Sequence, residues 1–255
     1  MPTCRITILM YHAINPRPSP ITVDPRTFQA QMQYLADSRI PVLSLHNLVE
    51  RLRRQDLPNR AVIITFDDGF ASVYTHALPI LIEHGFPATV FLVPGYCGAW
   101  NDWPDQPDCI PRMRLLDWSQ VQEMAACNID FGAHSVSHRR LDRIPKNAAR
   151  REILDSQKII EDRLGRPVAF FAYPYGRCSA AAETIVRSAF LGACTAEIRY
   201  GTTTSDPWRL PRIEVHYLRR FTVFRNVVRG QGSGYLTARR YVRTVGVHLL
   251  RRPWR

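Results

Sequence analysis

The chain has 255 residues, 45% of them hydrophobic, and a formal net charge of +12. This length suits one α/β barrel domain or two smaller domains, and the apolar fraction excludes an intrinsically disordered chain. No apolar run reaches the roughly 18 to 20 residues that a membrane-spanning helix needs, and residues 1–10 are predicted to form a first strand rather than a signal peptide.

The positive charge is concentrated at the C-terminal end. Residues 209–255 hold twelve arginines against one acid, Glu214, so this segment carries +11 of the net charge of +12. We therefore divide the chain into a barrel domain, residues 1–220, and a basic tail, residues 221–255. The six cysteines include no Cys-x-x-Cys pair and are typical of thiols in a reducing compartment, so we expect a cytoplasmic protein.

Short β-rich runs alternate with helical patterns along the chain. Strands are predicted at residues 5–11, 61–66, 88–93, 129–133, 168–173, 190–195 and 212–216. Helices are predicted at residues 24–37, 44–54, 71–83, 117–126, 147–164 and 179–188, with Asp24 and Ser44 as N-caps and a capping box from Asp117 to Gln120. This alternation predicts a parallel α/β fold. Because no Gly-x-Gly-x-x-Gly follows the first strand, we expect a barrel rather than a dinucleotide-binding fold.

The tail begins with a different pattern. A glycine-rich stretch at residues 230–234 is typical of a hinge or helix breaker, and residues 237–252 follow with a helical pattern. This helix either packs on the barrel with solvated arginines, which we favour, or lies on an anionic membrane surface. Its apolar side would carry Tyr241, Val242, Val245 and Leu249, and Arg239, Arg240 and Arg243 would lie largely away from them.

Two predicted strands end in residues that can bind a metal ion. Asp67, Asp68 and Gly69 follow the second strand, where one carboxylate could bind an ion and the other move a proton, although a plain Asp-Asp-Gly turn has the same sequence. His134 and His138 follow the fourth strand, with the spacing of one side of a helical turn. In a parallel barrel both segments lie at the same mouth, so two imidazoles and Asp68 would form a three-ligand site with an open position, as in catalytic zinc sites.

A third motif, Pro174-Tyr175-Gly176, ends the fifth predicted strand, and alone it predicts no more than a turn. Taken together, Thr65-Phe66-Asp67-Asp68-Gly69, His134-Ser-Val-Ser-His138 and this turn resemble the polysaccharide deacetylase family, also called carbohydrate esterase family 4, which is built on the NodB homology domain. The resemblance extends from about Arg5 to His216 and leaves the basic tail uncovered. It implies a distorted (β/α)7 barrel and metal-dependent hydrolysis of N-acetyl groups, whose carbon–nitrogen bonds are not peptide bonds.

The resemblance also implies roles for the motif residues. Asp67 matches the general base, which acts on a metal-bound water, and the backbone N–H of Tyr175 matches the oxyanion contact. Asp68, His134 and His138 match the metal ligands. The expected ion is Zn²⁺, with Co²⁺ or Ni²⁺ as alternatives.

The sequence departs from the family pattern at several positions. Ala172 replaces the arginine that usually steadies the base, and Arg212 is either its substitute or an ordinary member of the basic tail. The usual Leu-x-His that supplies the acid and the later acidic and Trp motif have no clear counterparts. We expect His12 to be the acid, with His216 as the alternative. The reason is that the Tyr-His-x-Ile stretch at residues 11–14 resembles the branch that acts on poly-N-acetylglucosamine and related exopolysaccharides.

We therefore expect a metal-dependent deacetylase of N-acetylhexosamine units in a polysaccharide or lipid-linked glycan, cytoplasmic or peripheral at the inner membrane face. The alternative is a catalytically silent barrel that binds anionic lipid or nucleic acid through its basic tail. Nucleic acid is the less favoured partner, because the barrel lacks interleaved aromatic and basic residues. In the long loop predicted at residues 95–114, Trp100 and Trp103 would anchor the loop or stack on sugar faces.

Overall fold

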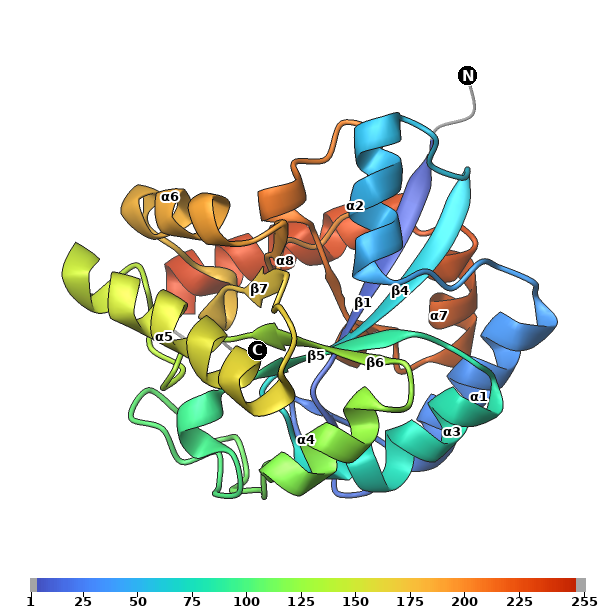
Figure 1. Cartoon of the computed structure of the whole chain (residues 1–255). Coiled ribbons are helices and arrows are strands. Elements are labelled where there is room, and N and C mark those ends of the chain that lie inside the picture. The colour runs from blue at the N-terminus through green and yellow to red at the C-terminus, as the bar shows by residue number, and fades with distance from the viewer. Residues whose placement is uncertain (1–3, 251–255) are drawn as a thin grey trace.

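The computed structural model describes the backbone of residues 4–250 and the side chains up to residue 243. In this part of the chain, the centre is a seven-stranded sheet in the order β8-β7-β6-β5-β4-β1-β9 (Figure 1). All neighbouring strands are parallel. The strands are β1 Arg5–Tyr11, β4 Arg60–Phe66, β5 Ala88–Leu92, β6 Ile129–Ala133, β7 Phe170–Ala172, β8 Gly192–Cys194 and β9 Ile213–Glu214. All seven predicted strands are confirmed, and the last three are shorter than predicted.

The two edges of the sheet meet through the segment at residues 210–214. Leu210 pairs with Cys194 at the end of β8, and Ile213 pairs with Leu9 of β1. The backbone N–H of Leu210 donates to the carbonyl of Ala193 at 2.8 Å. This connection curls the sheet into the expected distorted (β/α) barrel. A second, two-stranded sheet of β2 Ala13–Ile14 and β3 Thr22–Val23 was not predicted.

Helices surround the curled sheet (Figure 1). They are α1 Pro25–Asp37, α2 Leu45–Arg54, α3 Leu78–Glu83, α4 Trp118–Ala125, α5 Lys146–Leu164, α6 Ala180–Ala189, α7 Phe221–Val228 and α8 Ser233–Leu250. A π-helical turn, Val73–Ala77, leads into α3. The predicted N-caps Asp24 and Ser44 accept hydrogen bonds from the first turns of α1 and α2, and Asp117 and Gln120 form the predicted capping box. The local signals therefore placed the helix starts correctly.

Alternation along the strands separates two hydrophobic cores. Ile6 and Ile8 of β1 belong to the smaller core inside the curl, where α2 covers them with Leu45 and Leu48. Leu9 and Tyr11 belong to the larger core between the sheet and the outer helices. Because both faces of each strand are buried, the strand ends at the mouth are held firmly in place.

The segment predicted as a tail begins with residues that pack on the barrel. Helix α7 buries Phe224, Val227 and Val228 in the larger core. Helix α8 starts inside the glycine-rich stretch, where the N–H of Gly232 donates to the hydroxyl of Tyr200 at 3.0 Å. The division at residue 220 stays a prediction, and residues 251–255 of the predicted tail lie outside the described residues.

The predicted orientation of α8 is wrong in its described part. Arg239 lies over the ring of Tyr217 at 4.9 Å, and Arg243 donates to the carbonyl of Ala196 at 2.9 Å, so both arginines face the barrel. Tyr241 and Val242, expected on the packed side, are 71% and 54% exposed. The prediction assumed that the apolar residues of α8 mark its buried face. Guanidinium groups also pack well on aromatic rings, so arginines can occupy that face instead. The side chains of Val245 and Leu249 lie outside the described residues.

No helix in the described part of the chain has both the length and the apolar character to cross a membrane.

Candidate metal centre

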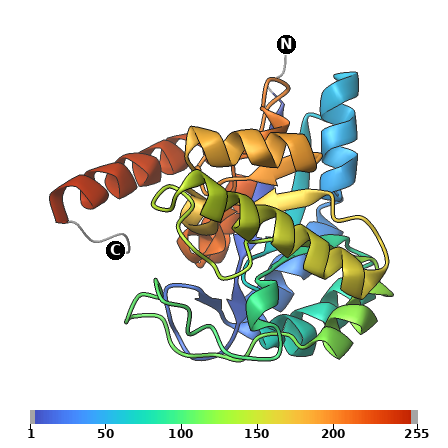
Figure 2. The ribbon, with the colours of Figure 1, turned by 60° about the vertical axis from the view of Figure 1, so that its left-hand side comes forward.

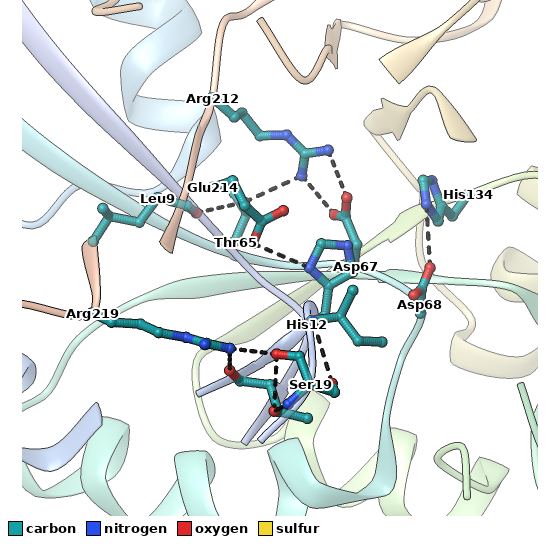
Figure 3. Close-up of polar contacts among 12 residues, drawn as sticks. Leu9, His12, Ser19, Thr65, Asp67, Asp68, His134, Arg212, Glu214 and Arg219 are labelled. Carbon is teal, nitrogen blue, oxygen red and sulfur yellow. Dashed lines mark hydrogen bonds and ion pairs between the residues drawn. The ribbon is translucent and has the colours of Figure 1, made fainter. Parts of the chain in front are cut away.

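Two neighbouring carboxylates leave the end of β4 in different directions. Asp68 and Gly69 both have left-handed backbone conformations, with φ of 70° and 72°, so the chain turns sharply after Asp67. Figure 3 shows the result, with the Asp67 carboxylate facing Arg212 and the Asp68 carboxylate facing His134. The turn therefore gives the two acids separate partners.

The two histidines lie in the loop after β6, and the predicted helical turn there is wrong. Ser135 and His138 have positive φ values of 62° and 56°, which no right-handed helix accommodates. Glu152 of α5 holds this loop: its carboxylate accepts from the N–H of Ser137 at 2.9 Å and from the hydroxyl of Ser137 at 2.6 Å. The backbone carbonyl of Glu152 also accepts from the N–H of Val136 at 3.1 Å. The histidines converge because of this clamped loop.

Asp68, His134 and His138 share one small volume. The Oδ1 atom of Asp68 lies 3.5 Å from Nε2 of His134 and 3.2 Å from Nε2 of His138. Among the described residues, one potential ligand atom from each of the three lies within 4.8 Å of the others, and all three side chains are buried. The structure therefore brings together the three predicted metal ligands.

The hydrogen bonds of the two imidazoles fix which nitrogen faces the site. The Nδ1 atom of His134 donates to the carbonyl of Ala172 at 2.7 Å. The hydroxyl of Tyr175 donates to the carbonyl of Asp105 and accepts from Nδ1 of His138, each at 3.1 Å. Both Nδ1 atoms therefore carry a proton, and in each ring Nε2 is the nitrogen that faces Asp68. Partners of this kind are typical of histidines that bind metal ions.

The charges and unmet hydrogen bonds of the site fit a divalent cation. Oδ1 of Asp68 is buried and accepts no hydrogen bond from the described residues. Burial would raise the pKa of Asp68, but His138 and His134 hold it well below its usual value, so the carboxylate is ionised. Burial and the neighbouring His134 lower the pKa of His138 in spite of Asp68, which favours the neutral form that binds metals. Two imidazoles and one carboxylate make a donor set suited to zinc.

Asp67 is held by the arginine that the sequence offered as a substitute. Arg212, only 1% exposed, donates from its two terminal nitrogens to the two carboxylate oxygens of Asp67 at 2.6 and 2.7 Å. Its Nε donates to the carbonyl of Thr195 at 3.0 Å. Burial raises the pKa of Asp67, but the charge of Arg212 outweighs it and lowers the pKa below the ordinary value. Asp67 is therefore ionised and fixed in orientation.

His12 and His216, the two candidate acids, have different surroundings. His12 follows β1 and lines the same pocket as Asp67, with its Nδ1 3.6 Å from Oε1 of Glu214. Burial disfavours the charged form of His12, but Glu214 outweighs burial and raises the pKa of His12 to about 9. His216 is not among the residues that line this pocket, and burial lowers its pKa.

Sequence reasoning missed Glu214 as a functional residue. It is the one acid in residues 209–255, which hold twelve arginines, and it lies in β9, two positions after Arg212. The sequence did hold a signal for Glu214. It is a lone acid in a basic segment, and two positions along the predicted strand at residues 212–216 place it on the same face as Arg212. Its side chain is buried beside His12.

The pocket around these residues has about 680 Å³ of space, counting the part open to solvent. One wall comes from the loop at residues 95–114, where Trp103 is 2% exposed and packs against His138 with ring centroids 4.3 Å apart. Trp100 packs under Arg112, whose guanidinium lies 4.4 Å from the ring centroid. These contacts favour the anchoring role of both tryptophans over stacking on a sugar.

Comparison with known proteins points to one family. A family model described as "Polysaccharide deacetylase" matches residues 54–192, more than half of the chain. The protein YxkH of Bacillus subtilis is 28% identical over 174 residues, which are 68% of this chain and 57% of that protein. The poly-beta-1,6-N-acetyl-D-glucosamine N-deacetylase of Staphylococcus epidermidis is 25% identical over 204 residues, 76% of this chain and 68% of that protein. The chain thus spans a little over half to two thirds of the length of these relatives.

Solved structures share the fold. The deacetylase PplD of Streptococcus pyogenes, in complex with acetate, has a TM-score of 0.70 and 26% identity, over 83% of this chain and 92% of that chain. IcaB of Ammonifex degensii has a TM-score of 0.76 and 23% identity, over 89% of this chain and 97% of that chain. The similarity to IcaB supports the distorted barrel with seven strands.

Proposed function

The chain belongs to the polysaccharide deacetylase family, and from this premise we propose that it is a metal-dependent hydrolase that removes N-acetyl groups from a glycan. One observation carries the proposal: the cluster of Asp68, His134 and His138 shares a pocket with Asp67, which Arg212 holds apart from the cluster. PplD, which has the same fold, binds acetate, the product of such a reaction. The alternative of a catalytically silent barrel is not favoured, because the side chains that the reaction needs lie in one pocket.

Each residue of the pocket has a part in the proposed reaction. A divalent ion bound by Asp68, His134 and His138 would supply Lewis acidity at the acetyl carbonyl. Asp67, ionised and fixed by Arg212, accepts the proton of the attacking water.

The remaining steps concern the oxyanion and the leaving amine. Tyr175 has a φ of 59°, and its backbone N–H is the proposed donor to the oxyanion. His12, with a pKa of about 9, is charged at neutral pH and can protonate the amine as the carbon–nitrogen bond breaks. His12 is proposed over His216 because only His12 lines the pocket.

The proposed substrate contains N-acetylhexosamine, as a polysaccharide or a lipid-linked glycan. It is supported by the poly-beta-1,6-N-acetyl-D-glucosamine N-deacetylase of Staphylococcus epidermidis, which is 25% identical. The proposed ion is Zn²⁺, with Co²⁺ and Ni²⁺ as alternatives, because imidazole nitrogen suits all three. The test is acetate release from acetylated chito-oligosaccharides and from poly-N-acetylglucosamine fragments with each ion. No acetate from any substrate with any of the ions would refute the proposal.

We also propose a cytoplasmic location with peripheral contact at the inner membrane face. The support is that α8 exposes Tyr241 and Val242 within a basic segment, a combination found in helices that lie on anionic membranes. Fractionation of cells that express the full-length protein or a form ending at residue 230 tests this idea. Equal partition of both forms between membrane and soluble fractions would refute a targeting role of the tail.

A further inference from the structure

A cation from outside the family match enters the proposed active-site pocket. Arg243 of α8 lines the same pocket as Asp67 and His12, although α8 follows the matched segment, residues 54–192. Figure 2 shows α8, in red, and the loop at residues 95–114, in green, extending from the same side of the barrel. The pocket therefore has a wall from a helix that lies outside residues 54–192.

The first half of α8 is attached to the barrel along one face. The hydroxyl of Tyr235 donates to the carbonyl of Tyr217 at 2.5 Å, and the guanidinium of Arg239 lies 4.9 Å from the ring centroid of the same Tyr217. Tyr235, Arg239 and Arg243 are spaced by four residues, so they lie on the same side of the helix. The contacts of the first two residues therefore direct Arg243 toward the pocket.

Arg243 is held next to the turn that carries the proposed oxyanion donor. One of its terminal nitrogens donates to the carbonyl of Ala196 at 2.9 Å. A Cβ added at Gly176 would lie 2.5 Å from the Cβ of Ala196, so the turn after Tyr175 packs directly against Ala196. The guanidinium of Arg243 is thus bound to a residue that packs against this turn, and it lines the same pocket.

The charge of Arg243 is not balanced within the pocket. Asp67 is paired with Arg212, and Glu214 faces His12. Across the described residues, the ion pairs of the pocket include none to Arg243, which donates a hydrogen bond to the neutral carbonyl of Ala196. A guanidinium has five N–H donors, so donors remain for a ligand. A divalent ion bound beside Asp68 would add further positive charge to the same space.

We propose that Arg243 binds an anionic oxygen group on the glycan, a phosphate or a carboxylate, so that the pocket selects a negatively charged N-acetylated substrate. Guanidinium groups bind such oxygens with two parallel hydrogen bonds, which combine charge with direction. This inference deepens the proposed function and rests on it. Arg243 is a specificity residue in this view and takes no part in the bond cleavage.

The test compares three related probes on the full-length, zinc-loaded protein. They are acetylated chitotriose, its glycosyl phosphate, and its oxidised form with a terminal carboxylate. The measured quantity is the affinity for each anionic probe divided by the affinity for the neutral probe. Affinities are measured by titration calorimetry, and all proteins carry Asp67→Asn so that the probes are not turned over. We expect Arg243→Gln to lower this ratio about tenfold, the order expected for one hydrogen bond to a charged group.

The controls separate charge recognition from structural support. Arg243→Lys should retain part of the ratio, and higher salt should lower it in the parent protein but little in Arg243→Gln. Arg225→Gln removes an exposed arginine of α7 that does not line the pocket and should leave the ratio unchanged.

An unchanged ratio in Arg243→Gln would overturn the inference, including the case in which all probes weaken equally. The phosphate and carboxylate arms identify which group is preferred. Absence of acetate release by the wild-type protein would refute the proposed function, whereas the affinity ratios would still decide the role of Arg243.

Discussion

Arg212 donates two parallel hydrogen bonds of 2.6 and 2.7 Å to the carboxylate of Asp67, which lies 145 residues earlier in the sequence. The pair is buried, and it supports the barrel as well as the proposed base. The two acids are adjacent in sequence but have different partners: Asp67 pairs with Arg212, and Asp68 faces His134 and His138.

Asp67→Asn should leave metal binding intact and remove most of the activity. The amide keeps the shape of the side chain and leaves Asp68, His134 and His138 in place, but it cannot accept the proton. A general base contributes about 10²- to 10⁴-fold, so kcat should fall by about that factor. Metal content by elemental analysis and acetate release check the two parts. Full activity in Asp67→Asn would exclude its role as the base.

Arg212→Met should destabilise the protein strongly. It would leave the charge of Asp67 buried without its partner, and breaking a buried pair in this way costs about 3–5 kcal/mol. Denaturant unfolding measures the loss. The double variant Asp67→Asn with Arg212→Met should recover part of that free energy, because it removes the buried charge. Equal destabilisation in the single and double variants would contradict this explanation.

Loss of the metal should lower both stability and turnover. Asp68→Ala and His134→Ala each remove one of three ligands, so metal content and acetate release should be lost together. A bound ion stabilises only the folded form, so a chelator should lower the Tm of the zinc-loaded wild type by several degrees. The same chelator should leave the Tm of Asp68→Ala unchanged, and a similar fall in both proteins would argue against an ion at this site.

The activity should decline at alkaline pH as His12 loses its proton. Glu214 raises the pKa of His12 from 6.5 to about 9, despite burial, so the charged form persists at neutral pH. The stability that this pair contributes is fully present below pH 6.5 and is lost as the pH rises through about 9.

Glu214→Gln removes the partner that raises this pKa. The alkaline limb of kcat/KM should therefore move to lower pH in this variant, and a pH–rate profile measures the shift. Identical profiles for Glu214→Gln and wild type would exclude Glu214 from tuning the acid. His216→Gln, outside the pocket, serves as the comparison variant.

Glu152→Gln should weaken metal binding without touching a ligand. Its carboxylate clamps Ser137 through two hydrogen bonds and so sets the path of the loop between the two histidines. Loss of such outer contacts typically costs 10- to 100-fold in metal affinity, and we expect about tenfold. Competition with a zinc indicator measures it. Asp155→Asn, an exposed acid on the same helix, should leave the affinity unchanged, and equal affinities in Glu152→Gln and wild type would contradict the positioning role.

The sequence alone predicted the seven strands, most helices and the three metal ligands. These features depend on local periodicity, on capping residues such as Asp24 and Asp117, and on motifs at strand ends, all of which are written in consecutive residues. A parallel barrel places the carboxyl ends of all its strands at one mouth. For this reason Asp68, His134 and His138, which follow two different strands, could be predicted to lie together.

Only the tertiary structure decided how distant side chains pair. The left-handed backbone at Ser135 and His138 depends on the clamp from Glu152, and only the fold shows that His12, and not His216, lines the pocket with Asp67. Likewise, α8 turns Arg243 toward the barrel because Arg239 packs on the ring of Tyr217 and Arg243 donates to the carbonyl of Ala196. The physical reason is the same in each case: periodicity fixes which face of an element a residue occupies, whereas packing against other elements fixes what that face meets.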